Sequence, residues 1–285
     1  MSFPPKAYLI GAQKSGTTTL AFLLDQHPKI TVSRPKEPNF FNAHWEKGLG
    51  WYRNCFEGAP DDALLLDASP SYTHSPIYPG APVALSEVDR RDVAERIHSV
   101  APDARLIYIL RDPIDRTYSS YWHTVRAGRE TRPWAEAITP RSNYVATSSY
   151  HAQLAVYLEH FSLDQFLILK FDDLARDPVA VARQVTAFLG VAPADFPYQF
   201  DSPKNQSYQY NHVGRILTRI AGTEERFFAL SNFAKRFTPP VLRDMIRRTI
   251  TDDIPKLDAE ERRKARALFA DDMAKLKELT GISFD

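Results

Sequence analysis

The chain has 285 residues, of which 44% are hydrophobic and 25% are charged, as in an ordinary soluble globular protein. Its 36 basic and 35 acidic residues give a net charge of +1, which argues against bulk electrostatic binding to nucleic acid. No stretch approaches the roughly 20 apolar residues of a membrane span, and the first apolar run is too short for a signal peptide. The lone cysteine, Cys55, cannot form an intrachain disulfide, so the sequence favours a cytoplasmic protein without a membrane partner.

Apolar runs alternate with helical spacing over the first two thirds of the chain. Strands are predicted at 7–10, 64–66, 105–110 and 166–170. Helices are predicted at 19–26, 88–100, 116–126, 150–161 and 178–189, the third of them with Asp112 as N-cap and Pro113 at its first position. Buried strands that alternate with helices indicate a parallel sheet covered on both faces.

The pattern loosens after Gly190, and residues 239–279 are charged and helical in spacing. We therefore expect one domain over residues 1–285, with an α/β fold of three layers in which helices flank a central parallel sheet. The core is expected over about 7–220, and a helical C-terminal extension over about 221–285.

A polar segment lies at the first strand-to-helix junction, Gly11–Thr19 (GAQKSGTTT). Backbone N–H groups, the partial positive charge of a helix N-terminus and the charge of Lys14 together form a site for an anion such as phosphate. The order departs from the nucleoside-triphosphate P-loop, in which glycine precedes lysine and the next hydroxyl binds Mg²⁺. The alternative is a polar helix start with an unrelated lysine.

A second segment, Arg111–Tyr121 (RDPIDRTYSSY), follows the clearest predicted strand. Ligands bind at the carboxyl ends of strands in open α/β sheets, where Arg111 is expected. Arg116, Ser119 and His123 share one face of the predicted helix. An arginine and a serine hydroxyl can hold a phosphate through charge-assisted hydrogen bonds. The alternative is an ordinary helix start, in which Arg116 pairs with one of the two aspartates of the segment.

Together the two segments resemble the nucleotide motifs of sulfotransferases that use 3′-phosphoadenosine 5′-phosphosulfate (PAPS), which have a P-loop-like fold. The resemblance implies that Lys14 contacts the phosphosulfate near its bridging oxygen, and that Arg111 and Ser119 bind the 3′-phosphate. It also implies a 5′-phosphate site made of Ser15, Gly16, Thr17 and Thr18. A weaker match places Gly214 and Arg215 in a loop over the 3′-phosphate. No metal is required.

The segment Arg34–Phe41 (RPKEPNFF) is similar to the Lys-Glu-x-x-Phe-Phe stretch of the heparan-sulfate branch and related bacterial enzymes. In that branch the glutamate is the general base, which makes Glu37 the candidate here. The alternative is a loop carboxylate paired with a neighbouring cation. His123 and His74 are alternative bases, because histidine titrates near neutral pH. Asp67–Tyr72 (DASPSY) is similar to the acceptor-site stretch of the family, but Ala68 replaces a frequent lysine.

The sequence thus predicts an enzyme that moves a sulfuryl group from PAPS to a hydroxyl or amine of a saccharide or small-molecule acceptor. The expected by-product is adenosine 3′,5′-bisphosphate. A nucleotide kinase is one alternative, although the Gly-Lys-Ser/Thr order is absent. A non-catalytic nucleotide-binding module is another, because a fold does not fix a function.

Overall fold

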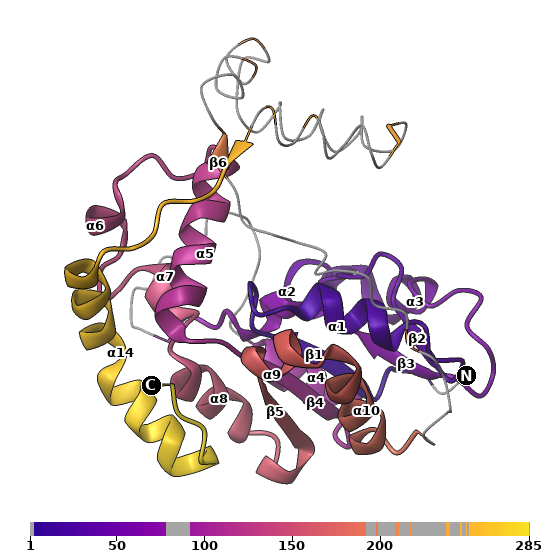
Figure 1. The fold of residues 1–285 in the computed structure, drawn as a ribbon. Coiled ribbons are helices and arrows are strands. Elements are labelled where there is room, and N and C mark those ends of the chain that lie inside the picture. The colour runs from indigo at the N-terminus through magenta and orange to yellow at the C-terminus, as the bar shows by residue number, and fades with distance from the viewer. Residues whose placement is uncertain are drawn as a thin grey trace.

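The computed structural model describes residues 3–77, 92–191 and 251–284, and isolated positions at 198, 209–210, 217, 220, 238–239, 246 and 249. Its centre is a five-stranded parallel sheet in the order β2-β3-β1-β4-β5 (Figure 1). The strands are β1 (Ala7–Gly11), β2 (Ile30–Val32), β3 (Leu64–Asp67), β4 (Arg105–Leu110) and β5 (Phe166–Lys170). The four predicted strands are confirmed, and β2 is an additional edge strand.

The central strands alternate between two hydrophobic cores, because successive side chains of a strand point to opposite faces. Leu9 of β1 and Ile107 of β4 belong to one core, whereas Tyr8 and Leu106 of the same strands belong to the other. Since both faces are buried, these strands consist of continuous apolar runs rather than of alternating polar and apolar residues.

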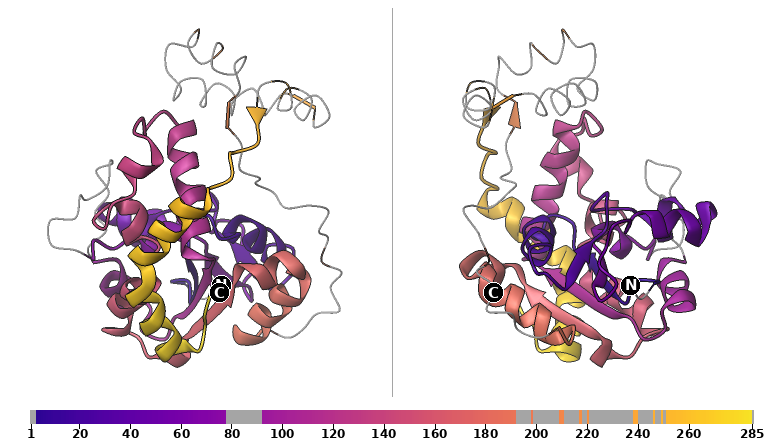
Figure 2. Two further views of the ribbon diagram at one scale, coloured as in Figure 1. Left: turned by 60° about the vertical axis from the view of Figure 1, so that its left-hand side comes forward. Right: turned by 90° about the vertical axis from the view of Figure 1, so that its right-hand side faces the viewer.

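Helices cover each face of the sheet. The first core is closed by α1 (Thr17–Leu24), α9 (Phe171–Arg176) and α10 (Pro178–Phe188). The second is closed by α2 (Phe40–Ala43), α3 (Gly48–Asn54), α4 (Val93–Val100) and α8 (Tyr150–Leu158). This is the predicted three-layer α/β architecture, visible from two sides in Figure 2. Helix α1 begins at Thr17, two residues earlier than predicted and directly after Gly16.

Helix α5 (Pro113–Arg126) begins as predicted. The Asp112 carboxylate accepts hydrogen bonds from the amides of Ile114 and Asp115 at 3.0 and 2.9 Å, and Pro113 occupies the first helical position. A third, smaller core joins α5 to α7 (Asn143–Ala146) and α14 (Ala259–Thr280).

Helix α14 lies in the predicted helical extension and along α5 and α8 (Figure 1), whereas the described residues just before it, 251–258, are not helical. Its Arg262 and Arg266 pair with Asp112 and Asp115 at the start of α5. The predicted boundary near residue 220 falls where only isolated positions are described. The remaining short elements are η1 (Trp45–Lys47), η2 (Pro70–Thr73), α6 (Trp134–Ala137), η3 (Leu163–Gln165) and the antiparallel pair β6 (Gln209–Tyr210) and β7 (Thr251–Asp252).

The strand order places the ends of three neighbouring strands at one edge of the sheet. The chain leaves β1 for β2 and β3 on one side, and then crosses to β4 and β5 on the other. Open α/β sheets bind ligands at this kind of reversal, outside the carboxyl ends of the strands. The loop after β1, Asp67 at the end of β3 and Arg111 after β4 all lie at this edge.

Candidate active site

The loop between β1 and α1 has a backbone shaped to receive an anion. Lys14 and Gly16 both have positive φ, at 73° and 85°, and the Ser15 amide turns back to the Ala12 carbonyl at 3.1 Å. Successive amides in such a turn, followed by the unpaired amides of a first helical turn, form a concavity for anions. Glycine suits position 16, because it adopts a positive φ without strain and a Cβ there would lie 2.7 Å from the Leu174 side chain.

Lys14 lies in a strongly positive environment. Burial and then the charges of Arg126, Arg116 and Arg111 lower the pKa of Lys14 to about 8, while Glu37 opposes the shift. Cations gathered at one loop repel each other, and a ligand with several negative charges relieves that repulsion. The electrostatics therefore favour a polyanion over a neutral ligand.

Arg111 extends from the end of β4 to the phosphate loop. Its guanidinium donates to the Lys14 carbonyl at 3.4 Å and lies over the Phe171 ring, 4.8 Å from the centroid. The Tyr150 hydroxyl donates to the Arg111 carbonyl at 2.8 Å and so fixes the strand end. The two segments predicted to hold phosphates therefore meet in space, as the parallel arrangement of β1 and β4 requires.

Arg116 lies fully buried behind the loop. Its guanidinium donates to the Gln13 carbonyl at 3.0 Å, the Tyr144 carbonyl at 3.2 Å and the Ser148 hydroxyl at 2.8 Å, and also contacts Thr147 and Ser120. The alternative of an ion pair with Asp112 or Asp115 is wrong, because those carboxylates pair with α14. Arg116 instead supports the phosphate loop through its hydrogen bond to Gln13. Its positive charge is hydrogen-bonded to neutral oxygens and not to a carboxylate.

Replacing Arg116 with methionine is expected to lower the free energy of unfolding by roughly 3 kcal/mol, since buried acceptors left unpaired cost about 1–3 kcal/mol each. Arg262→Met is the matched control, because it removes a partly exposed pair expected to contribute at most about 1 kcal/mol. Urea unfolding of the two variants measures the difference. Equal midpoints would show that Arg116 does not support the loop.

The Ser15 hydroxyl is fully buried and makes no hydrogen bond of regular geometry with the described residues. Burial raises the pKa of Tyr150 to about 12, and the nearby Ser15 hydroxyl is one of the groups that oppose this rise. A buried hydroxyl at the base of an anion-shaped loop is the kind of donor that a bound phosphate oxygen would complete. Ser119 is also buried, on α5.

His123 is neutral in this site. Burial, followed by the charges of Lys14, Arg126 and Arg129, lowers the pKa of His123 to about 3. Its Nδ1 lies 3.0 Å from the Arg126 guanidinium, and arginine only donates, so Nδ1 accepts and Nε2 carries the proton. His123 is thus arranged to donate a hydrogen bond rather than to take up a proton.

Glu37 lies in the loop before α2, near Lys14. Its Oε1 accepts from Lys36 Nζ at 2.7 Å, so the expected pairing with a neighbouring cation is present. The side chain is 39% exposed and reaches solvent, while its charge still acts on Lys14. Glu37 therefore lies near Lys14 and is partly exposed to solvent. An acceptor molecule could reach both side chains from this position.

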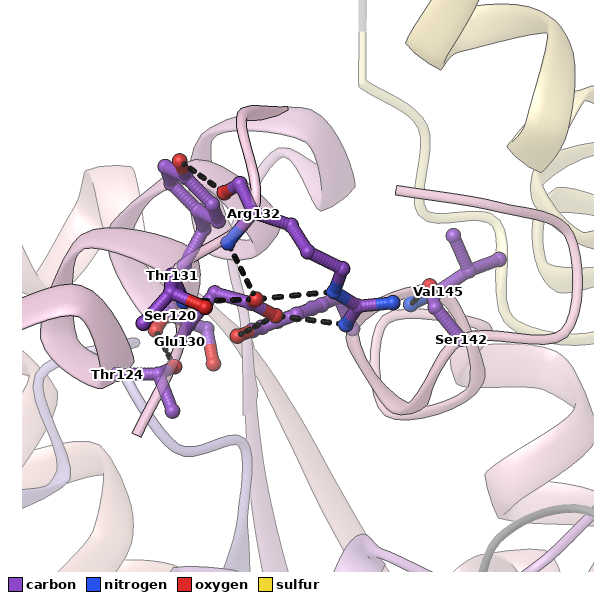
Figure 3. A network of polar contacts seen from close by, with 9 residues as sticks. Ser120, Thr124, Glu130, Thr131, Arg132, Ser142 and Val145 are labelled. Atoms are coloured by element: carbon purple, nitrogen blue, oxygen red, sulfur yellow. Dashed lines mark hydrogen bonds and ion pairs between the residues drawn. The ribbon is translucent and has the colours of Figure 1, made fainter. Parts of the chain in front are cut away.

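The turn that ends α5 is fastened by Glu130 (Figure 3). Its carboxylate accepts from the Thr131 and Arg132 amides at 3.0 Å each and from the Arg132 guanidinium at 2.7 Å. Those hydrogen bonds, the Arg132 side chain first, lower the pKa of Glu130 to about 2. These hydrogen bonds order the turn after α5, and the Tyr121 hydroxyl of α5 donates to the Arg132 carbonyl at 2.9 Å and so ties this turn to the helix that carries His123.

Of the predicted site residues, the structure brings Lys14, Glu37, Arg111 and His123 around one loop. Gly214 and Arg215 lie outside the described residues. Sequence reasoning missed Arg126, although its position one turn after His123 on the same helix could have indicated it. Within the described ranges, no helix is long and apolar enough to span a bilayer, and no cluster of potential metal ligands occurs.

Residues 4–213 match the family described as sulfotransferase domain. The chain belongs to the sulfotransferase domain family. A crystal structure of a sulfotransferase from Alicyclobacillus acidocaldarius is 25% identical, with a TM-score of 0.64 over 99% of this chain and 98% of that one. The alignment of the two chains thus extends over nearly the whole length of both.

Two mouse relatives of the sulfotransferase domain are longer than this chain. Heparan sulfate glucosamine 3-O-sulfotransferase 3A1 is 30% identical over 197 residues, which cover 66% of this chain and 46% of that protein. Bifunctional heparan sulfate N-deacetylase/N-sulfotransferase 4 is 32% identical over 212 residues, covering 66% of this chain and 22% of that protein. The chain therefore spans less than half the length of either relative.

Proposed function

We propose that this sulfotransferase domain moves a sulfuryl group from PAPS to a hydroxyl or amine of a carbohydrate or small-molecule acceptor and releases adenosine 3′,5′-bisphosphate. The observation that carries the proposal is the gathering of Lys14, Arg111, Arg116 and Arg126 at a loop shaped for an anion. A donor phosphorylated at both ends of its ribose matches two anion-binding segments that meet at one edge of the sheet.

The residues present fit this donor. The amides of the loop and of the first turn of α1, together with the buried Ser15 hydroxyl, would hold the 5′-phosphate. Arg111 and the buried Ser119 would hold the 3′-phosphate. Bound PAPS supplies an activated sulfuryl group on a phosphate leaving group, so no metal is needed for the transfer.

The protein's own groups then have separate tasks. Lys14 and the loop amides stabilise the negative charge that develops on the leaving phosphate, as preorganised donors do for other oxyanions. Glu37 accepts the proton that the acceptor hydroxyl or amine loses as its O–S or N–S bond forms and the sulfur–oxygen bond to the phosphate breaks. Glu37 is a better candidate than His123, whose accepting nitrogen is already engaged by Arg126.

A carbohydrate is the favoured acceptor class. Two relatives carry names that describe sulfation of heparan sulfate, and Glu37 lies in a stretch that resembles the Lys-Glu-x-x-Phe-Phe segment of the heparan-sulfate branch. The near-neutral net charge does not oppose a saccharide, because Arg126 and Arg129 add local positive charge next to His123. The cytoplasmic location expected from the sequence stays a prediction.

Calorimetric titration with adenosine 3′,5′-bisphosphate, run in parallel with Mg-ATP, tests the proposal. We expect a dissociation constant on the order of micromolar for the bisphosphate, weakened in both Lys14→Met and Ser119→Ala. Labelled PAPS with a panel of glucosamine-containing oligosaccharides and small phenols or amines then identifies an acceptor. Binding of Mg-ATP without the bisphosphate would instead support the kinase alternative.

A further inference from the structure

Three hydroxyl groups converge on the carboxylate of Asp67, which is fully buried at the carboxyl end of β3. Ser69 donates to its Oδ1 at 2.7 Å, while Tyr52 and Tyr72 donate to its Oδ2 at 2.7 and 2.8 Å. Among the described residues, no cation forms an ion pair or hydrogen bond with this carboxylate. Burial destabilises this charge, and its hydroxyl donors together with the nearby charge of Lys36 offset that cost, so the carboxylate adds little net stability and its presence requires another explanation.

Two of these hydroxyls also accept hydrogen bonds from the backbone of residues 37–41, the segment that carries Glu37. The Ser69 hydroxyl accepts from the Asn39 amide at 3.1 Å, and the Tyr72 hydroxyl accepts from the Phe41 amide at 3.4 Å. The third hydroxyl, that of Tyr52, has no such link and instead lies near Tyr8 of β1. Asp67 is thus bonded to the segment 37–41 through two relays, and Tyr52 serves as an internal comparison.

Hydrogen bonds within and next to the segment 37–41 also fix it, and one of them holds the backbone carbonyl of Glu37. The Asn39 amide side chain donates to the Glu37 carbonyl at 3.1 Å and accepts from the Ser71 hydroxyl at 2.7 Å. Asn39 has a positive φ of 50°, in the left-handed region that asparagine adopts more readily than most residues. The hydroxyl of Ser69 accepts from the backbone amide of this same residue, Asn39.

The direction of the relays depends on the charge of Asp67. A carboxylate only accepts, so it draws the single hydroxyl proton of Ser69 and of Tyr72 towards itself and leaves their oxygens to accept from Asn39 and Phe41. Hydrogen bonds arranged in such a chain strengthen one another. An amide at position 67 would present a donor on one side, and at least one hydroxyl would have to reverse.

We propose that Asp67 is a positioning residue, which holds the Glu37–Phe41 segment through the Ser69 and Tyr72 hydroxyls and thereby presents the Glu37 carboxylate beside Lys14. The catalytic part of this statement rests on the proposed function, whereas the structural part does not. Asp67 itself is fully buried and does not touch the reacting groups.

Amide hydrogen exchange of the whole chain, without ligand, tests the structural part. In Asp67→Asn, exchange in a peptide covering 37–41 is expected to rise by about tenfold or more, while a peptide covering 14–18 stays at the wild-type rate. Ser69→Ala, which leaves Asp67 in place, should raise exchange in the same peptide, and Tyr52→Phe should not. Unchanged exchange at 37–41 in Asp67→Asn and Ser69→Ala, or an equal rise in every peptide, would overturn the proposal.

Turnover with the acceptor found in the labelled-PAPS screen tests the catalytic part. Ser69→Ala and Asp67→Asn are expected to lower kcat by about tenfold or more with bisphosphate affinity within about twofold, and Tyr52→Phe to change neither. The Glu37→Gln variant distinguishes a failure of Glu37 as the general base from a failure of Asp67 as the positioning residue. If that variant keeps its kcat, the role of Glu37 in the proposed function fails, whereas full kcat in Asp67→Asn beside an inactive Glu37→Gln refutes the positioning role.

Discussion

Lys14→Met is expected to lower kcat by about 10²–10³-fold, the loss found when one donor to a developing oxyanion is removed. The bisphosphate should also bind about tenfold or more weakly, because a hydrogen bond from a charged donor contributes about 1.5–3 kcal/mol. Methionine retains the length of the side chain, so the effect comes from the charge. Steady-state turnover and calorimetry measure the two losses separately.

The pH dependence of bisphosphate binding follows from the ionisation of Lys14. Burial and the neighbouring arginines lower the pKa of Lys14 to about 8, so the free protein loses this charge as the pH rises through about 8. A bound anion favours the charged form, and binding above that pH must therefore take up a proton. Affinity should fall above about pH 8 in the wild type, whereas Lys14→Arg should remove this part of the pH dependence.

Lys29→Met is the control for the lysine experiments, because Lys29 forms an exposed ion pair with Asp62 away from the loop. It should leave turnover, affinity and their pH profiles unchanged. Wild-type turnover in Lys14→Met together with wild-type affinity would contradict the assignment of the loop as the donor site.

Glu37→Gln is expected to lower kcat by about 10²–10⁴-fold with bisphosphate affinity within about threefold, since a general base acts on the acceptor rather than on the donor. Glutamine keeps the shape of the side chain and an oxygen that accepts from Lys36. Glu46→Gln, on an exposed residue of η1, is the matched control and should behave as the wild type. Rates are measured with saturating PAPS and acceptor.

His123→Asn decides between the two candidate bases. The neutral imidazole accepts from Arg126, so its loss should reduce turnover less than the loss of the Glu37 carboxylate. An inactive His123→Asn beside an active Glu37→Gln would transfer the role of base to the histidine.

Local chemistry explains what could be predicted from the sequence. The phosphate loop is set by residues adjacent in the chain, and Asp112 and Pro113 specify the start of α5 without help from elsewhere. The strands β1, β3, β4 and β5 are long enough and apolar enough to stand out, because both of their faces are buried.

Long-range contacts explain the rest. Nothing near Arg116 in the sequence indicates that Gln13, Tyr144 and Ser148 will surround it, and nothing near Asp112 indicates that it will pair with arginines of α14. The three donors to Asp67 come from separate elements, α3, the β3–η2 junction and η2. Edge strand β2 has only three residues, too few to show a pattern.

The place of β1 in the middle of the sheet has a consequence for the chain during its synthesis. Ala7 of β1 pairs with Leu66 of β3 on one side and with Arg105 of β4 on the other. The pairing of β1 is therefore complete only after β4, the strand that precedes Arg111, has been made. Lys14 precedes Arg111 by 97 residues in the sequence, so the lysine loop is made well before Arg111 and Arg116. The donor site therefore forms only when β4 and α5 are in place.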